Sequence, residues 1–157
     1  MKKGILETSS HQETEALAAR FARSLHGGEI IFLRGPIGAG KTVFVKGIAR
    51  ALGLKSSPTS ASFSLMKSYQ NKRFHLFHID LFRLEESEVF NLGFEEMLED
   101  EQAIILAEWP DPICCMLPQD RLEMNFILQA GNRRKIEVSS FGPVSDARLE
   151  ALCHTEP

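Results

Sequence analysis

Residues 35–42, with the sequence GPIGAGKT, match the phosphate-binding pattern G-x-x-x-x-G-K-[ST]. Glycines let successive backbone N–H groups turn toward one point, at the amino end of the following helix, where the helix dipole already favours an anion. In such a loop Lys41 would reach the β and γ phosphates of a nucleotide, and the Thr42 hydroxyl would coordinate Mg²⁺. We therefore predict that phosphate is held by Gly35, Pro36, Ile37, Gly38, Ala39, Gly40, Lys41 and Thr42.

Two acidic residues end apolar runs elsewhere in the chain. Asp80 closes the run LFHID, and Glu108 closes AIILAE. Ligands of open α/β sheets bind at the carboxyl ends of the strands, and phosphoryl transfer needs a carboxylate near the metal and a group that orients the attacking water. Both acids are therefore catalytic candidates. The alternative is that each acid caps its strand or pairs with a neighbour such as Arg83.

His78 and Trp109 stand beside these acids in the sequence. His78 lies on the same strand face as Asp80, where a histidine is more often a structural hydrogen-bonding residue than a catalytic one. Trp109, the only tryptophan, is either a core residue whose indole N–H needs a partner, or a site residue that shields water or contacts another protein. The sequence leaves both questions open.

The elements that position these residues follow the order of an α/β protein. Ser10 and Glu13 form a capping-box pattern before a helix at about residues 11–26, and a short apolar run at 29–34 predicts a buried strand. After the phosphate loop, helical spacing continues to Gly53, so strand, loop and helix follow the βαβ order. The remaining pattern predicts strands at 63–69, 74–80, 103–109, 122–128 and 135–139, helical structure at 85–100 interrupted at Gly93, and a helix at 144–154.

Composition limits the possible functions. The 157 residues are 43% apolar and 25% charged, which predicts one soluble domain over residues 1–157. A net charge of -3 argues against a protein that grips DNA or RNA by itself. The start lacks the apolar segment of a signal peptide, and we find no membrane span. Three cysteines without a C-x-x-C pair predict reduced, partly buried thiols and a cytoplasmic protein.

The blocks GPIGAGKT, FHIDLFRL, LGFEEML and AIILAEWPD, in this order, resemble the bacterial TsaE (YjeE) family over about residues 10–139. The resemblance implies a three-layer α/β fold of the P-loop NTPase type, with a mixed, partly parallel central sheet and β-hairpins. It implies an ATPase with ATP and Mg²⁺ as cofactors. Because the chain is short and has no lid, we expect this ATPase to be weak alone and to depend on partner proteins for hydrolysis. The family serves the threonylcarbamoyladenosine modification of tRNA next to the anticodon, with the proteins TsaD and TsaB as partners and the tRNA reached only through that complex.

The resemblance also implies a role for each site residue. Lys41 and Thr42 would hold phosphate and magnesium, Glu108 would be an acid on the metal side, and Asp80 and Trp109 would be needed for turnover or coupling.

The adenine would lie near residues 10–14, where Thr14 is our expected contact, and Arg134 is a second expected nucleotide contact. The sequence departs from the family where Phe82 replaces a tyrosine. A hydroxyl that senses the γ phosphate is either Thr59 or Ser62, and the sequence does not decide between them.

The sequence disfavours three other functions. A small-molecule kinase, the main alternative, would use the same loop but needs an arginine-rich lid, which the sequence does not show. A GTPase needs Asn-Lys-x-Asp, and Asn71-Lys72 is followed by Arg-Phe. A protein with a vestigial nucleotide site is disfavoured because Lys41, Thr42 and both acids are intact.

Overall fold

The apolar runs form the central strands of one sheet. β2 (Glu29–Arg34) pairs in parallel with β5 (Ala103–Glu108) and with β6 (Leu122–Leu128), and β5 pairs in parallel with β4 (His75–Asp80). Central strands with helices on both faces need apolar side chains along their length, which explains why these runs are nearly continuous. The computed structural model describes residues 1–54, 65–82, 84–112 and 117–154.

Antiparallel strands complete the sheet at both edges. β3 (Met66–Gln70) forms a hairpin with β4, and β7 (Arg134–Ser140) forms a hairpin with β6, so the β-hairpins expected from the resemblance are present in the described residues. β1 (Lys2–Thr8) pairs with β7 and was not predicted. The described chain thus contains a seven-stranded sheet in the order β1-β7-β6-β2-β5-β4-β3.

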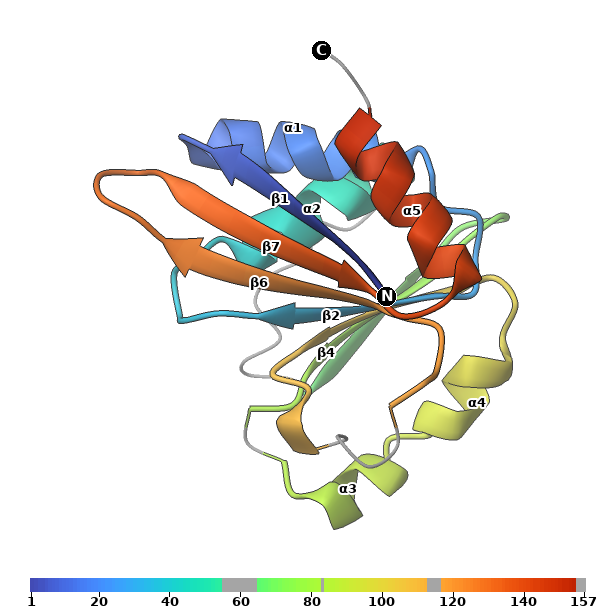
Figure 1. Ribbon diagram of the computed structural model, residues 1–157. Helices are drawn as coiled ribbons and strands as arrows, with labels where there is room; N and C mark the ends of the chain where they lie inside the picture. The colour runs from blue at the N-terminus through green and yellow to red at the C-terminus, as the bar shows by residue number, and fades with distance from the viewer. Residues whose placement is uncertain (55–64, 83, 113–116, 155–157) are drawn as a thin grey trace.

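Helices cover both faces of the sheet, which confirms the three-layer α/β fold (Figure 1). α1 (His11–Ala22), α2 (Lys41–Ala51) and α5 (Pro143–His154) lie on one face, and the short α3 (Glu86–Phe90) and α4 (Phe94–Glu99) lie on the other. Each face has its own hydrophobic core. The first includes Leu17, Phe21, Leu33, Phe44, Ile48 and Phe126, and the second includes Phe32, Ile79, Val89, Phe94, Met97 and Ile105.

The first helix begins as its sequence predicts but ends earlier. The Ser10 hydroxyl accepts a hydrogen bond from the Glu13 backbone N–H, and the Glu13 carboxylate accepts one from the N–H of Ser9. α1 ends at Ala22 rather than near residue 26, yet Leu25 beyond it is 2% exposed and packs in the core. The apolar spacing therefore continued past the end of the helix because Leu25 is buried there.

Gly47 allows α2 to cross α1 closely. A Cβ atom at this position would lie 2.6 Å from the carbonyl oxygen of Glu15 and 2.7 Å from the Cβ of Ala18. Alanine normally stabilises a helix by about 1 kcal/mol relative to glycine, whereas overpacking a core costs about 1–3 kcal/mol. We expect Gly47→Ala to lower the free energy of unfolding in urea, although the higher helix propensity of alanine alone would raise it. An equal or higher value would contradict the close crossing.

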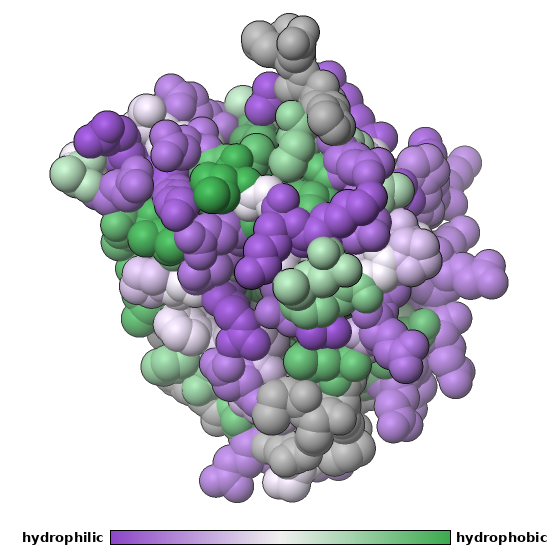
Figure 2. All heavy atoms as spheres, viewed as in Figure 1, coloured by the Kyte–Doolittle hydropathy of each residue, from purple (hydrophilic) through white to green (hydrophobic). Residues whose placement is uncertain are grey.

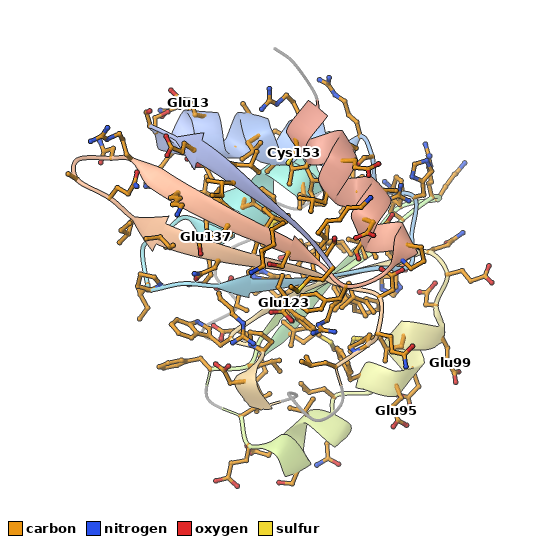
Figure 3. The ribbon with its side chains drawn as sticks, in the orientation of Figure 1. Glu13, Glu95, Glu99, Glu123, Glu137 and Cys153 are labelled. Carbon is orange, nitrogen blue, oxygen red and sulfur yellow. The ribbon has the colours of Figure 1, made fainter. Side chains whose placement is uncertain are left out.

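The exposed surface is mainly hydrophilic on the face drawn in Figure 2, with small hydrophobic areas between polar ones. Glu95 and Glu99 are exposed and point outward from α4 (Figure 3). Cys153 is a free thiol but is exposed, so the predicted partial burial is wrong for this cysteine, which sits near the chain end on α5. Within the described ranges, no helix combines the length and apolar content needed to cross a membrane.

Candidate nucleotide site

The phosphate loop, residues 35–42, connects the end of β2 to the start of α2, which is the context that its sequence pattern requires. Gly35 has a φ of 129°, and a Cβ there would lie 2.4 Å from the carbonyl oxygen of Phe126 on β6. Gly40, with a φ of 104°, lies at the amino end of α2. Side chains at these two positions would strain or displace the loop, so the glycines keep its backbone N–H groups available to an anion.

Lys41 is held inside the loop. Its Nζ donates hydrogen bonds to the carbonyl oxygens of Gly35 (2.6 Å) and Pro36 (3.0 Å), and the side chain is 5% exposed. Burial lowers the pKa of Lys41, and the nearby charges of Glu108 and Asp80 offset part of this shift. A buried ammonium of this kind gains much from an arriving phosphate, because the negative charge of the phosphate compensates for the hydration that burial removed.

The two predicted acids meet at the loop. Asp80 and Glu108 lie opposite each other at the ends of β4 and β5. Both are largely buried, and both line a cavity of about 200 Å³ together with Lys41. The other lining residues are His11, Ile37, Gly38, Gly40, Thr42, Val43 and Trp109. The structure therefore brings five loop residues, both acids and Trp109 to one cavity, and the meeting of the two acids follows from their positions at strand ends. Gly35, Pro36 and Ala39 are not among the residues that line it.

Glu108 lies between two nitrogen atoms. Its Oε2 is 3.8 Å from the Nζ of Lys41, and its Oε1 accepts a hydrogen bond of 2.8 Å from Nε2 of the fully buried His78. The Asp80 carboxylate accepts a hydrogen bond of 3.0 Å from the backbone N–H of Phe82. Two carboxylates with fixed orientations beside an ammonium group can order a water molecule or a metal ion against phosphate.

Trp109 has an unusual backbone. Among the described residues it is the one non-glycine with a positive φ, 57°, and its backbone N–H donates a hydrogen bond of 3.2 Å to the carbonyl of Leu33 on β2. This conformation places the indole ring 4.7 Å from the Nζ of Lys41 and 5.0 Å from the ring of Phe82, centroid to centroid. The geometry thus favours the interpretation of Trp109 as a site residue over that of a core residue.

The backbone of Trp109 gives a stability test. A left-handed conformation costs an L-residue about 1–2 kcal/mol, and glycine avoids this cost. We expect Trp109→Gly to unfold at higher urea concentration than Trp109→Ala, although glycine is usually the less stable of the two by about 0.5–1 kcal/mol. The control is Ala51→Gly in α2, because at this helical position the glycine variant should be less stable than the parent chain with alanine. A Trp109→Ala variant at least as stable as Trp109→Gly would contradict the strain.

Thr14 and Arg134 pack behind the phosphate loop. The Nε of Arg134 donates a hydrogen bond of 3.1 Å to the carbonyl of Ala39, and a Cβ on Gly40 would lie 3.1 Å from the same nitrogen. Thr14 is fully buried, its hydroxyl lies 2.8 Å from that of Thr8, and its Cγ2 would lie 3.7 Å from the same added Cβ. Both residues therefore support the loop, and their contact with a nucleotide stays a prediction.

The oxygen atoms at this cavity suit magnesium. Mg²⁺ is usually held by one or two carboxylates and hydroxyls together with substrate phosphates, rather than by a complete protein cage. Thr42 and Glu108 supply such donors on the cavity wall. Within the described residues, no group of three or more His, Cys, Asp or Glu side chains is arranged to hold a metal ion.

Thr59, Ser62 and Arg83 lie outside the described residues. His11 and Val43 also line the cavity and were not among the predicted site residues. His11 follows the helix cap and falls within the stretch expected near adenine, which was the signal available for it. Val43 directly follows the loop motif, and its apolar side chain gave no chemical signal.

Comparisons with known proteins found a matching family model and similar relatives. The family model described as threonylcarbamoyl adenosine biosynthesis protein TsaE matches residues 8–136. The tRNA threonylcarbamoyladenosine biosynthesis protein TsaE of Bacillus subtilis (strain 168) is 34% identical over 153 residues, which cover 98% of this chain and 93% of the relative. The protein of the same name from Rickettsia conorii is 37% identical over 128 residues, which cover 80% of this chain and 72% of the relative.

A solved structure has the same fold. The crystal structure of YdiB from Bacillus subtilis superposes with a TM-score of 0.80 at 30% sequence identity, and the match covers 96% of this chain and 94% of that one. The sheet, the helices on its two faces and the phosphate loop thus belong to a fold already seen in a relative of similar length.

Proposed function

Because the chain belongs to the TsaE family of tRNA threonylcarbamoyladenosine biosynthesis proteins, we propose that it binds ATP with Mg²⁺ and hydrolyses the ATP in support of that modification. One observation carries this proposal: Lys41, Asp80 and Glu108, from three separate segments, meet at the phosphate loop around one cavity. A loop that bound phosphate only for structural purposes would not need two buried carboxylates beside it, because they repel the anion.

Each residue then has a defined task. The loop amides and the Lys41 ammonium bind the β and γ phosphates, and Thr42 and Glu108 would hold magnesium. Bound Mg²⁺ would neutralise charge on the phosphates. Asp80 and Glu108 orient the attacking water, and Trp109 covers Lys41 and limits access of bulk water to it. These roles follow from the geometry of the cavity.

We further propose that hydrolysis depends on the partner proteins TsaD and TsaB. Ile37 in the loop is 83% exposed, and Phe82, which contacts Trp109, is 58% exposed. An open site orients water poorly, and phosphoryl transfer depends mainly on positioning. Exposed apolar side chains beside the cavity are suited to contact another protein that completes it.

The test compares phosphate release from ATP by the purified chain alone, and by the chain mixed with TsaD and TsaB. We expect slow release alone, faster release with both partners, and no release without Mg²⁺. Rapid hydrolysis alone that does not respond to the partners would contradict the proposal of partner dependence. Failure to bind ATP under any condition would contradict the proposed function itself.

A further inference from the structure

We propose that His78 is a positioning residue that holds the Glu108 carboxylate in the orientation needed for ATP hydrolysis, an inference that rests on the proposed function above. The strand register creates this contact. β4 and β5 pair so that Asp80 lies opposite Glu108 and His78 lies opposite Leu106. His78 therefore lies two residues before Asp80 on β4, farther than the two acids from the carboxyl ends of the strands.

The hydrogen bond fixes one oxygen of the carboxylate and leaves the other for the cavity. Nε2–H of His78 donates to Oε1 of Glu108 at 2.8 Å, while Oε2 lies 3.8 Å from the Nζ of Lys41. A carboxylate held at one oxygen has few remaining rotamers, so Oε2 stays directed toward the phosphate loop. Misplacing a reacting group by about 1 Å can cost about 100-fold in rate, so this restraint matters for a group that orients water or metal.

His78 acts only through Glu108. Its side chain is fully buried and is absent from the residues that line the cavity, so it cannot contact the nucleotide itself. Within the described part of the chain, its Nδ1 has no hydrogen-bond partner. An unsatisfied buried polar atom costs about 1–3 kcal/mol, a cost that a leucine of similar size would avoid. Packing alone therefore does not explain a histidine at this position, whereas holding Glu108 does.

His75 provides an internal comparison. It lies on the same strand and also contacts an acid, with its Nδ1 3.0 Å from Asp100, but at the opposite end of β4. This contact is partly exposed, and neither residue lines the phosphate-loop cavity. A variant of His75 thus removes a histidine and carboxylate pair from β4 without touching the site.

The main experiment uses two amides of different length. In His78→Gln the amide N–H reaches the place of Nε2, and in His78→Asn it stops near Nδ1 and cannot reach Glu108. With TsaD and TsaB present, we expect kcat for ATP hydrolysis to fall about 10–100-fold in His78→Asn and His78→Leu, the usual range when a group supporting a metal ligand is lost. We expect His78→Gln to keep a kcat close to that of the parent chain. All three His78 variants should bind ADP with the parental affinity, and His75→Leu should have the parental kcat.

Equal losses in His78→Gln and His78→Asn, or parental kcat in His78→Asn, would overturn the inference. A double variant adds a second check: in the Glu108→Gln background, His78→Asn should cause no further loss. A full additional loss would show that His78 acts independently of Glu108, which also overturns it.

A spectroscopic measurement separates this inference from the proposed function, because it needs no turnover. Nitrogen-detected imidazole spectra should show His78 as the Nε2–H tautomer, assigned by its absence in His78→Gln, and the signal should shift in Glu108→Ala. If the parent chain hydrolyses no ATP but gives this spectrum, the proposed function is refuted, whereas the hydrogen bond between His78 and Glu108 is confirmed. A parent chain with the Nδ1–H tautomer refutes the positioning role, whatever its activity.

Discussion

Lys41→Ala is expected to weaken ATP binding by about 100-fold, because two charge-assisted contacts to phosphate worth about 1.5 kcal/mol each would be lost. Titration calorimetry with a non-hydrolysable ATP analogue measures this change. Lys46→Ala is the matched control, since Lys46 lies on the same helix but does not line the cavity. Equal affinity of Lys41→Ala and the parent chain would contradict the assignment of the loop.

The same titration has a pH signature. Burial lowers the pKa of Lys41 below its usual 10.5, so the ammonium is lost at lower pH than in a free lysine. Phosphate binds the charged form, and the parent affinity should therefore weaken as pH rises through this lowered pKa, before pH 10.5 is reached. Lys41→Ala lacks the group and should not show this component. The difference identifies Lys41 as the source of the pH dependence.

Glu108→Gln should abolish most hydrolysis and leave nucleotide binding intact. The amide keeps the shape of the side chain but loses the charge that orders water and holds metal, and loss of one catalytic acid or base costs about 10²–10⁴-fold in rate. Phosphate release with TsaD and TsaB measures kcat, and calorimetry measures affinity for ADP. A variant that binds ADP as the parent does and hydrolyses ATP at the parental rate would remove Glu108 from the mechanism.

Glu123→Gln is the control for this variant. Glu123 is a half-buried glutamate on β6 (Figure 3), and it accepts a hydrogen bond of 2.8 Å from Arg121. Like Glu108, it lies on a strand and is paired with a basic side chain, but it does not line the cavity. Parental activity in Glu123→Gln would show that loss of a strand carboxylate is harmful only at the phosphate loop.

Local patterns predicted the centre of the molecule well. The sequence predicted the strand at 29–34, the loop and the following helix, because an apolar run, a glycine-rich stretch and a helical spacing follow one another directly. Asp80 and Glu108 were readable because each acid ends a buried run, and parallel strands end at the same edge of a sheet. Gly93, which has a φ of 70° at the start of α4, was recognisable as the point where a helical pattern breaks.

The parts that escaped prediction depend on contacts between distant segments. β1 is an edge strand whose pairing with β7, more than 120 residues later, leaves little periodic signal in the sequence. The left-handed backbone of Trp109 and the hydrogen bond between His78 and Glu108 exist only once β2, β4 and β5 are side by side. Sequence spacing places such residues on a strand, but it does not give their orientation.

The central claim is that the phosphate loop and the two acids form one site for ATP with magnesium. A crystal structure of the chain with a non-hydrolysable ATP analogue and Mg²⁺ tests this claim most directly. We predict the triphosphate within residues 35–42, Lys41 at the β and γ phosphates, and magnesium beside Thr42 with Glu108 and Asp80 turned toward it. A nucleotide bound elsewhere, or a filled loop with both acids turned away from the phosphates, would contradict the account.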